Sequence, residues 1–567
     1  MDKNNKQISE PLLNSTEDVQ EDIILDNTWS SKRNPHQSFI SKYKLYIIGS
    51  CCITILSTLI IALTLSPFKL TLHNYTRSVD DNVKPKNIIM MISDGLGPAS
   101  VSFARTYYQY TNNKPYDYQM PLDTIHIGQS RTRSSSTLVT DSAAGATAFS
   151  CNIKTYNGAV GVDPHKNPCG TILESAKHTQ GMLTALVATS RITHATPASF
   201  SAHVTDRDNE NMIAIQQIGD NPLGRSVDIM FGGGYCYFLP KSSKDSCRSD
   251  QRHLLNEAKE KYEWNTVIYN NKTAFDDLPV DPNILPAISL FSFDHMAYEI
   301  DRVPSKEPSL SEMSQKALDI LFKATENSDK GFFIMIEGSR IDMAAHSNDP
   351  ATHVHEILEY QRAVELVKKY VDEHPDTIMI STSDHETGGL SLARQVSHAY
   401  PEYLWYPDVL ANVKSSTVAL ADLISQNRTK EYVVETVLKD RLGITDATDE
   451  EIEQLLKSVD NIDYYLADMV SIRAQLGWAT HGHSGVDVNL YAYGNGIERL
   501  AGSHENTEIG QFITNTFGLD LKGITKQLNK NNPSFHLSNM TAEDKLEYNH
   551  VLQHYHHVPS HLKHPNL

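Results

Sequence analysis

The chain has 567 residues, of which 40% are hydrophobic and 21% are charged, which is typical of a globular protein. Its 50 Lys and Arg residues and 69 Asp and Glu residues give a net charge of −19 at pH 7. A chain this acidic is excluded as a general binder of nucleic acid, because phosphate backbones require a basic face. A site in it that binds an anion needs a local positive charge, which bound metal dications supply.

An apolar segment near the N-terminus predicts a membrane span. Residues 1–44 are polar and predict a disordered cytosolic tail. Residues 45–65 contain no charged side chain and are long enough for one transmembrane helix. The alternatives are the core of a signal peptide, which is shorter and lies nearer the N-terminus, or a buried helix. Because Lys and Arg residues are denser before the segment than after it, we expect a type II topology, with the catalytic part on the luminal side beyond a stalk over residues 66–85.

Four cysteines follow the predicted span, and the predicted compartment is oxidising, so disulfide bonds are expected. Four cysteines allow three pairings. We favour the sequence-local pairing, Cys151 with Cys169 and Cys236 with Cys247. Glycosylation sequons are consistent with export, and they begin at Asn74, Asn271, Asn427 and Asn539.

A large folded unit is predicted from residue 86 to about residue 525. Four apolar runs predict buried strands, at residues 87–92, 182–188, 332–336 and 377–380. Helical stretches alternate with these runs, notably residues 354–371. This alternation predicts an α/β fold with a large, mostly parallel central sheet that has helices on both faces. We expect residues 391–477 to be an insertion and residues 526–567 to be a polar, His-rich tail.

The segment from Glu337 to His346 places three potential metal ligands behind one predicted strand. Asp342 and His346 are spaced i, i+4, so in a helix they share one face and can bind one ion. Glu337 ends the strand, where an α/β sheet usually has its active site. A carboxylate with an imidazole suits zinc better than calcium. The alternative for Asp342 and His346 is an ion pair on a helix face.

A serine and an arginine are candidates for phosphate chemistry. Ser142 follows Asp141 and opens a run of small residues. If a helix begins there, its free N–H groups favour an anion, although an ordinary helix N-cap is the alternative. The guanidinium of Arg207 matches two phosphate oxygens, although a salt bridge to Asp206 or Asp208 is the alternative.

Further candidate ligands follow other predicted strands. Asp384 and His385 follow a predicted strand, and the nearby pair Gly388 and Gly389 permits a sharp turn, so both side chains can reach one metal. Asp94 follows the first predicted strand. The remaining candidates are His194, Thr196 and His483.

Together these segments resemble the alkaline phosphatase family. The resemblance extends in order from about residue 86 to about residue 520, and it rests on residues 93–95, 141–144, 194–197, 337–346, 384–389 and 483–488. It implies two zinc ions and one magnesium ion per chain. The implied ligands are Asp342, His346 and His483 for one zinc, Asp94, Asp384 and His385 for the other, and Asp94, Glu337 and Thr196 for magnesium. By the same resemblance, His194 reaches the magnesium through water, and Arg207 binds the phosphate.

The resemblance implies the hydrolysis of phosphate monoesters through a phosphoserine at Ser142, with broad specificity and an alkaline optimum. It also implies a homodimer, and the predicted anchor is similar to that of the fungal members in the vacuole membrane. One residue departs from the family: Met343 stands where bacterial members carry Lys and animal members carry His, and it cannot donate a hydrogen bond to phosphate. The alternatives are a phosphodiesterase or sulfatase with the same two-metal platform, or an inactive metal-stabilised membrane scaffold.

Overall fold

The computed structural model describes residues 84–400, 403–457 and 460–530. The predicted cytosolic tail, the predicted span over residues 45–65 and the predicted C-terminal tail after residue 530 lie outside these ranges. Within the ranges described, no helix has the length and apolar character needed to cross a membrane.

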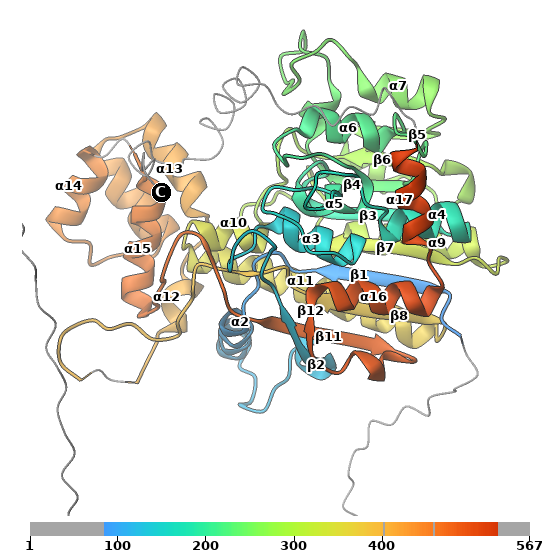
Figure 1. Ribbon diagram of the computed structural model, residues 1–567. Coiled ribbons are helices and arrows are strands. Elements are labelled where there is room, and N and C mark those ends of the chain that lie inside the picture. Colours follow the sequence, from blue (N-terminus) through green and yellow to red (C-terminus); the bar gives the residue numbers. More distant parts are fainter. Residues whose placement is uncertain (1–83, 401–402, 458–459, 531–567) are drawn as a thin grey trace, which may run out of the picture. The chain divides into compact units, whose positions relative to one another are not determined.

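A ten-stranded sheet with the order β12-β2-β11-β8-β1-β7-β3-β4-β6-β5 lies at the centre of the described residues (Figure 1). Its strands are β1 (Asn87–Ile92), β2 (His126–Arg131), β3 (Leu183–Arg191), β4 (Ile229–Gly233), β5 (Thr266–Tyr269), β6 (Ala287–Leu290), β7 (Phe332–Glu337), β8 (Thr377–Thr382), β11 (Val488–Gly494) and β12 (Gly502–Glu505). Strand β11 runs antiparallel to its neighbours β8 and β2, whereas the other pairings are parallel. The α/β fold with a mostly parallel sheet is therefore confirmed, with one antiparallel strand inside it.

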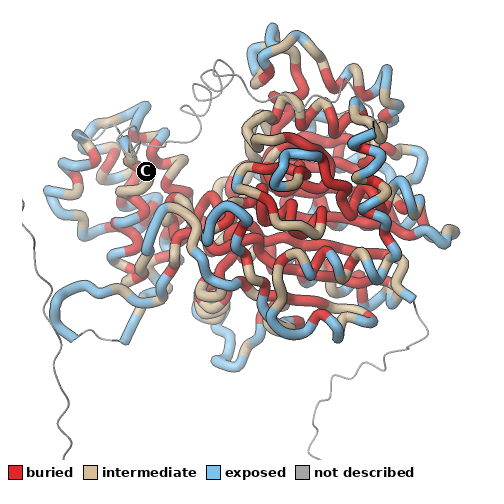
Figure 2. Tube along the Cα trace, in the orientation of Figure 1, coloured by how far each residue is buried: buried red, intermediate tan, exposed pale blue. Residues whose placement is uncertain are grey.

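The four strands predicted from apolar runs are adjacent in the order β8-β1-β7-β3. Every residue of β1, β7 and β8 is buried, as expected for strands that are covered on both faces. In β1, Ile89 and Met91 face one hydrophobic core, while Ile88 and Met90 face another. This alternation follows from the period of two along a strand. Figure 2 shows the buried residues concentrated in the sheet and along the helix faces next to it.

Helices cover both faces of the sheet. The core that contains Ile89 also receives side chains from α2 (Pro98–Thr111), η2 (Leu122–Ile125), α8 (Lys272–Asp276), α9 (Leu310–Thr325), α10 (Arg340–His346) and α11 (Pro350–Glu373). The core that contains Ile88 receives side chains from α3 (Ser142–Cys151), α4 (Ile172–Gln180), α5 (Ala195–Ser201), α6 (Glu210–Ile218), η3 (Tyr235–Phe238), α7 (Leu254–Lys261), η6 (Ile497–Leu500), α16 (Asn506–Phe517) and α17 (Leu521–Asn529). A short 3₁₀ helix, η4 (Pro282–Ile284), precedes β6.

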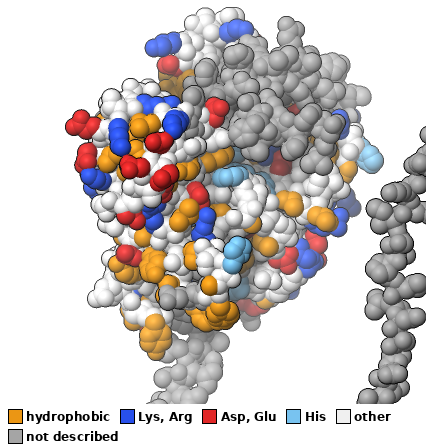
Figure 3. All heavy atoms as spheres, turned by 90° about the vertical axis from the view of Figure 1, so that its left-hand side faces the viewer, with side chains coloured by type: hydrophobic (Ala, Val, Ile, Leu, Met, Phe, Trp, Pro, Cys, Tyr) orange, Lys and Arg blue, Asp and Glu red, His pale blue; other side chains and the backbone are white. Residues whose placement is uncertain are grey.

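The described parts of residues 391–477 are mainly helical, and the two ends of this segment lie side by side. Its helices are α12 (Pro407–Ala411), α13 (Thr417–Gln426), the π-helix η5 (Tyr432–Arg441), α14 (Asp449–Lys457) and α15 (Ile462–Ala474). The two ends of the segment meet, because Ser391 and Gly477 exchange two backbone hydrogen bonds of 2.7 and 2.9 Å. On part of the face drawn in Figure 3, acidic and basic side chains lie next to one another. Ion pairs at i, i+4 spacing within the inserted helices include Glu435–Lys439 and Glu453–Lys457.

Two disulfide bonds stabilise the unit, Cys151–Cys169 and Cys236–Cys247. The sequence-local pairing is thus confirmed. The first bond fixes the C-terminal end of α3, the helix that begins with Ser142.

Candidate active site

The carboxyl ends of three central strands bring buried carboxylates together. Ile92 of β1 pairs in register with Glu337 of β7 and with Thr382 of β8, so the residues after these strands meet at one edge of the sheet. Asp94, Glu337 and Asp384 are all fully buried there. Burial, and next the charge of Asp384, raises the pKa of Asp94 well above its ordinary value. Burial also raises the pKa of Glu337 to about 7, although polar neighbours such as Ser190, whose hydroxyl lies 3.4 Å from Glu337 Oε2, oppose this shift.

The surroundings of these carboxylates are suited to the binding of a cation. Within the residues that the structure describes, neither oxygen of Asp94 accepts a hydrogen bond. Buried charges in proteins are normally paired or coordinated to metals, because an uncompensated one costs several kcal/mol. A dication at this edge of the sheet would hold Asp94 and Glu337 ionised.

Ser142 lies against a second cluster of polar groups. It is the first residue of α3, and the side chain of Asp141 caps that helix by accepting a hydrogen bond from Ala144 N at 2.9 Å. The hydroxyl of Ser142 lies 3.0 Å from Nε2 of His385. The same nitrogen is 3.4 Å from Asp94 Oδ1 and 3.2 Å from Asp384 Oδ2. Two carboxylates, an imidazole and a hydroxyl therefore converge on one point, which is a donor set suited to zinc.

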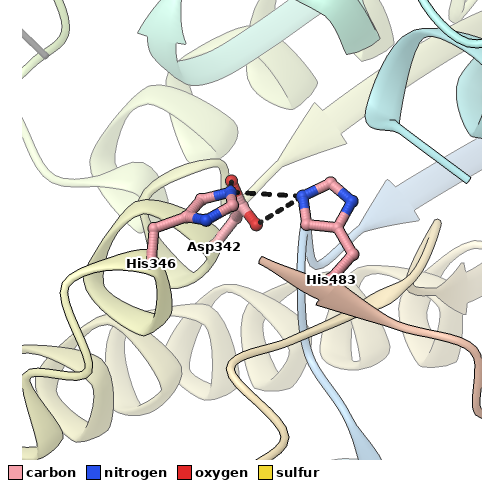
Figure 4. Close-up of side chains that lie close together, drawn as sticks. All are labelled: Asp342, His346 and His483. Atoms are coloured by element: carbon pink, nitrogen blue, oxygen red, sulfur yellow. Dashed lines mark hydrogen bonds and ion pairs between the residues drawn. The ribbon is translucent and has the colours of Figure 1, made fainter. Parts of the chain in front are cut away.

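A third cluster joins α10 to a loop far away in the sequence (Figure 4). Asp342 and His346 extend from one face of α10 and approach each other to 3.3 Å, while His483 lies opposite and is 3.6 Å from Asp342. His483 is brought there by a small antiparallel sheet of β9 (Glu386–Thr387) and β10 (His483–Ser484), in which it pairs with Thr387. The i, i+4 grip predicted for Asp342 and His346 is thus present, and one carboxylate and two imidazoles converge.

Backbone carbonyls determine which nitrogen of each imidazole is available. His346 Nδ1 donates to the carbonyl oxygen of His481 at 2.5 Å, and His483 Nδ1 donates to that of Thr140 at 2.8 Å. The two Nε2 atoms consequently face each other at 3.2 Å. Burial, and next the charge of His385, lowers the pKa of His483 to about 3, so its Nε2 carries a lone pair at neutral pH. Two such nitrogens are stable at this distance only with a proton or a metal ion between them, and Nδ1–H···O=C is the usual support of a metal-binding histidine.

Asp342 connects the second and third clusters. Its carboxylate belongs to one set of close groups with His346 and His483, and to another with Asp94 and His385. Burial alone opposes ionisation, but the charges of the neighbouring histidines lower the pKa of Asp342 well below its ordinary value. Thr387 Oγ1 donates a hydrogen bond to Asp342 Oδ1 at 2.5 Å. Sequence reasoning missed this second role of Asp342, since i, i+4 spacing indicates only the partner on the same helix.

Arg207 is held beside the nucleophile candidate. Its Nη1 atom donates to Asp141 Oδ2 at 3.0 Å, and its Nη2 atom lies 3.2 Å from His194 Nε2. Burial lowers the pKa of Arg207, but Asp141 more than offsets this effect and the net shift is upward, so the side chain stays charged. The ion pair that holds Arg207 is therefore with Asp141, the residue before Ser142, rather than with Asp206 or Asp208, the alternatives that the sequence suggested.

Met343 turns away from the ligands on the same helix. It is nearly buried in a small apolar cluster with Tyr298 and Ala344. Nη1 of Arg340 lies 3.1 Å from its sulfur, and the guanidinium of Arg340 stacks over the ring of Tyr298 at 3.6 Å. The methionine thus packs against a cation, where a lysine would meet repulsion.

A mostly parallel sheet that gathers carboxylates and imidazoles beyond its carboxyl ends is the framework of a metal-dependent hydrolase. Comparison with known proteins specifies the class. The family model described as alkaline phosphatase matches residues 85–519, and the chain belongs to the alkaline phosphatase family. This family consists of metal-dependent enzymes, and the chain is a hydrolase of phosphate monoesters.

The relatives extend over most of the chain. The alkaline phosphatase of Schizosaccharomyces pombe is 50% identical over 459 residues, which are 80% of this chain and 85% of the relative. The repressible alkaline phosphatase of Saccharomyces cerevisiae is 44% identical over 560 residues, which are 93% of this chain and 96% of the relative. Among solved structures, the cold-active alkaline phosphatase of a psychrophilic Shewanella species has a TM-score of 0.64 at 30% identity and covers 76% of this chain and 99% of its own. That of Thermus thermophilus has a TM-score of 0.66 at 26% identity, covering 83% and 96%.

Proposed function

We propose that the chain hydrolyses phosphate monoesters through a covalent phosphoserine at Ser142, with two zinc ions and one magnesium ion bound per chain. The observation that carries this proposal is the position of the Ser142 hydroxyl, 3.0 Å from His385 Nε2 and next to Asp94 and Asp384. A serine hydroxyl is a weak nucleophile at neutral pH unless a neighbouring group stabilises its deprotonated form.

The metal assignment follows the three clusters. Asp342, His346 and His483 would hold one zinc ion, and Asp94, Asp384 and His385 the other. Asp94, Glu337 and Thr196 would hold magnesium, with His194 near it through water. When bound, these dications lower the pKa of hydroxyl groups and neutralise charge on the attacking and leaving oxygens.

Magnesium is favoured at the Glu337 cluster because the donors there are hard oxygens, whereas the clusters with imidazoles suit zinc. A substituted form of the alkaline phosphatase from the Antarctic bacterium TAB5, 27% identical to this chain with a TM-score of 0.52, has Mg bound in a site named M3. This observation concerns that protein, in which a histidine is replaced by glutamate, and here the choice rests on the oxygen donors of Asp94, Glu337 and Thr196.

The residues of the chain carry the rest of the mechanism. The Ser142 oxygen forms a bond to phosphorus while the bond from phosphorus to the alcohol oxygen breaks, and the alcohol leaves. Arg207 binds two oxygens of the phosphoryl group, and its ion pair with Asp141 keeps the guanidinium beside Ser142. The N-terminus of α3 adds free N–H groups that favour the negative charge. Water then attacks the phosphoserine from the opposite side and releases inorganic phosphate.

Two properties follow from this chemistry. Because the proposed contacts are with the phosphoryl group, many alcohols are accepted and the specificity is broad. Higher pH favours the deprotonated serine and the attacking hydroxide, so the optimum is alkaline.

The proposal also includes the membrane attachment, the compartment and the oligomeric state of the enzyme. The apolar residues 45–65 would anchor the chain in the vacuole membrane with the catalytic unit on the luminal side, and the enzyme would act as a homodimer. The support is the uncharged segment with its flanking lysines and arginines, and the similarity to fungal enzymes across nearly the whole chain. Locating the tagged protein in intact cells, together with its glycans, tests the compartment.

Trapping the intermediate tests the nucleophile. Protein loaded with zinc and magnesium is mixed with a monoester that carries labelled phosphate and is quenched at low pH, where phosphoserine persists. We expect label on the peptide that contains Ser142, no label in Ser142→Ala, and normal labelling in the control Ser135→Ala, whose side chain is exposed. Label that persists in Ser142→Ala would overturn the assignment.

A further inference from the structure

A cavity of about 930 Å³ lies between the inserted helices and the loop that leads to His483. Tyr464 of α15 and Arg394 line it from the insertion, and Trp478 and His481 line it from the loop. None of these side chains belongs to the three clusters described above. The cavity is therefore a feature of its own, built largely by residues 391–477.

Two residues that line this cavity contact residues of the candidate active site. His481 and His346 exchange two hydrogen bonds, from each Nδ1 to the carbonyl oxygen of the other residue, at 2.5 and 2.7 Å. Trp478 packs directly on Gly388, where an added Cβ would lie 2.5 Å from ring atom Cε3. The cavity thus begins next to His346 and next to the turn that follows Asp384 and His385.

The direction of the reaction leads toward this cavity. In phosphoryl transfer the attacking and leaving oxygens lie roughly in line with phosphorus. Ser142 lies against His385 of one proposed zinc site, so in the two-zinc assignment the leaving alcohol oxygen is held by the other site, formed by Asp342, His346 and His483. An alcohol held there would lie near His346, whose hydrogen-bonded neighbour His481 lines the cavity.

The cavity is lined by planar side chains together with polar ones such as Gln454 and Asn461. The ring of His481 stacks on that of Tyr464 with centroids 4.1 Å apart and planes 14° from parallel. An ion pair of 3.0 Å with Asp468 holds Arg394 in place. The guanidinium of Arg394 is a second flat group in the lining. Aromatic faces and guanidinium planes bind other aromatic rings by stacking, whatever the detailed substituents of those rings are.

We propose that this cavity is a subsite for the alcohol portion of the substrate, and that it favours phosphomonoesters whose alcohol carries a planar aromatic ring, as in nucleoside monophosphates. The proposal rests on the phosphomonoesterase function proposed above, and it adds a preference that contacts with phosphate alone do not provide. The insertion is thereby the part of the chain that selects among substrates, while the sheet edge performs the chemistry.

A matched pair of substrates tests the subsite. Adenosine 5′-monophosphate and ribose 5-phosphate share the leaving oxygen and differ in the aromatic base, so the ratio of their kcat/KM values isolates recognition of the ring. Ala393→Trp fills the cavity from an exposed position on its wall, and Tyr464→Leu removes a stacking face. Ala399→Trp is the control, since Ala399 is exposed on the same segment but does not line the cavity.

We expect the adenosine-to-ribose ratio to fall about three- to tenfold in Ala393→Trp and in Tyr464→Leu, and to stay constant in Ala399→Trp. A ratio unchanged in both cavity variants, or lowered equally in the control, would overturn the subsite while leaving the phosphatase function intact. A wild-type holoenzyme that hydrolyses neither ester would overturn the proposed function and the subsite together.

Discussion

His346 and His483 present their Nε2 atoms to each other at 3.2 Å, while the Nδ1 atom of each is bound to a backbone carbonyl oxygen. The two residues are 137 positions apart in the sequence, and the pairing of β9 with β10 brings them together. Hydrogen bonding at Nδ1 fixes both tautomers so that the lone pairs point at one position, next to Asp342. This preorganisation is what a tightly bound zinc ion requires.

Removal of one of these imidazoles tests the zinc site. We expect His483→Ala to lose one of the two zinc ions per chain, measured by elemental analysis after dialysis, because Asp342 and His346 alone leave the ion half coordinated. Loss of even an indirect support of a metal ligand costs 10- to 100-fold in affinity or activity, so kcat/KM should fall by at least about 100-fold. His504→Ala, on β12, is the control. Retention of both zinc ions by His483→Ala would contradict the assignment.

The arginine beside Ser142 sets the affinity for phosphate. Arg207→Lys keeps the charge but loses the fork that binds two oxygens at once, and it weakens the hold of Asp141. We expect the inhibition constant of inorganic phosphate to rise about tenfold, which corresponds to the loss of one charge-assisted hydrogen bond. Arg105→Lys changes a distant Arg–Asp pair and should leave inhibition unchanged. Equal inhibition of Arg207→Lys and the wild type would show that the guanidinium does not contact phosphate.

The centre of the fold and most of the candidate ligands could be predicted from the sequence because they share one physical signal. Continuous apolar runs mark strands buried on both faces, and polar residues directly after such runs must lie at the edge of the sheet. Asp94, Glu337 and Asp384 were found in this way. The strands β2, β11 and β12 carry no comparable run, and in β2 only one residue is buried, while β12 has no buried residue. The antiparallel insertion of β11 was therefore not foreseen.

Other parts of the site carry no signal in the sequence. The carbonyl oxygens of Thr140 and His481, which orient two imidazoles, belong to the backbone and would be present with any residue there. The ion pair between Arg207 and Asp141 joins segments 66 positions apart, whereas sequence proximity suggested Asp206 or Asp208. The cavity beside His481 depends on how the inserted helices pack, and amphipathic patterns do not specify that packing.

The packing of Met343 predicts how the substitution of lysine, the residue of bacterial family members, would change stability at this position. In Met343→Lys the new ammonium lies beside the guanidinium of Arg340, which stacks on Tyr298, so like charges meet in a nearly buried position. We expect the free energy of unfolding to fall by about 1–3 kcal/mol in urea titrations, because burying an unpaired charge is costly. Met343→Leu conserves volume and should cost less than about 1.5 kcal/mol.

A double variant, Arg340→Leu with Met343→Lys, tests whether repulsion by Arg340 causes the loss of stability. If repulsion by Arg340 is responsible, the double variant loses less stability than the sum of the single variants, since coupled neighbours are not additive. A Met343→Lys protein that is as stable as the wild type and binds phosphate more tightly would mean that the lysine reaches the substrate instead, as the resemblance to other family members first suggested.

We expect the free energy of unfolding of the metal-free protein to depend on pH, because Glu337 binds a proton more tightly in the folded state than in the unfolded state. Burial raises the pKa of Glu337 from its ordinary value of 4.5 to about 7, so the folded, metal-free protein holds a proton that the unfolded chain has lost between these pH values. Stability must therefore fall as pH rises from about 4.5 to 7, by up to about 1.4 kcal/mol per pH unit. Asp94 acts in the same direction. Asp342 and Asp384, whose pKa values are lowered, lose their contribution only below about pH 4.

Urea unfolding at pH 5 and pH 7, with chelator and with magnesium and zinc restored, measures this effect. We expect the chelated protein to be less stable at pH 7 by a few kcal/mol, and the metal-loaded protein to lack this loss because bound dications hold the carboxylates ionised. In chelator, Glu337→Gln should reduce the difference between the two pH values, since the amide does not titrate. A chelated wild type whose stability rises between pH 5 and pH 7 would contradict the role of this buried carboxylate.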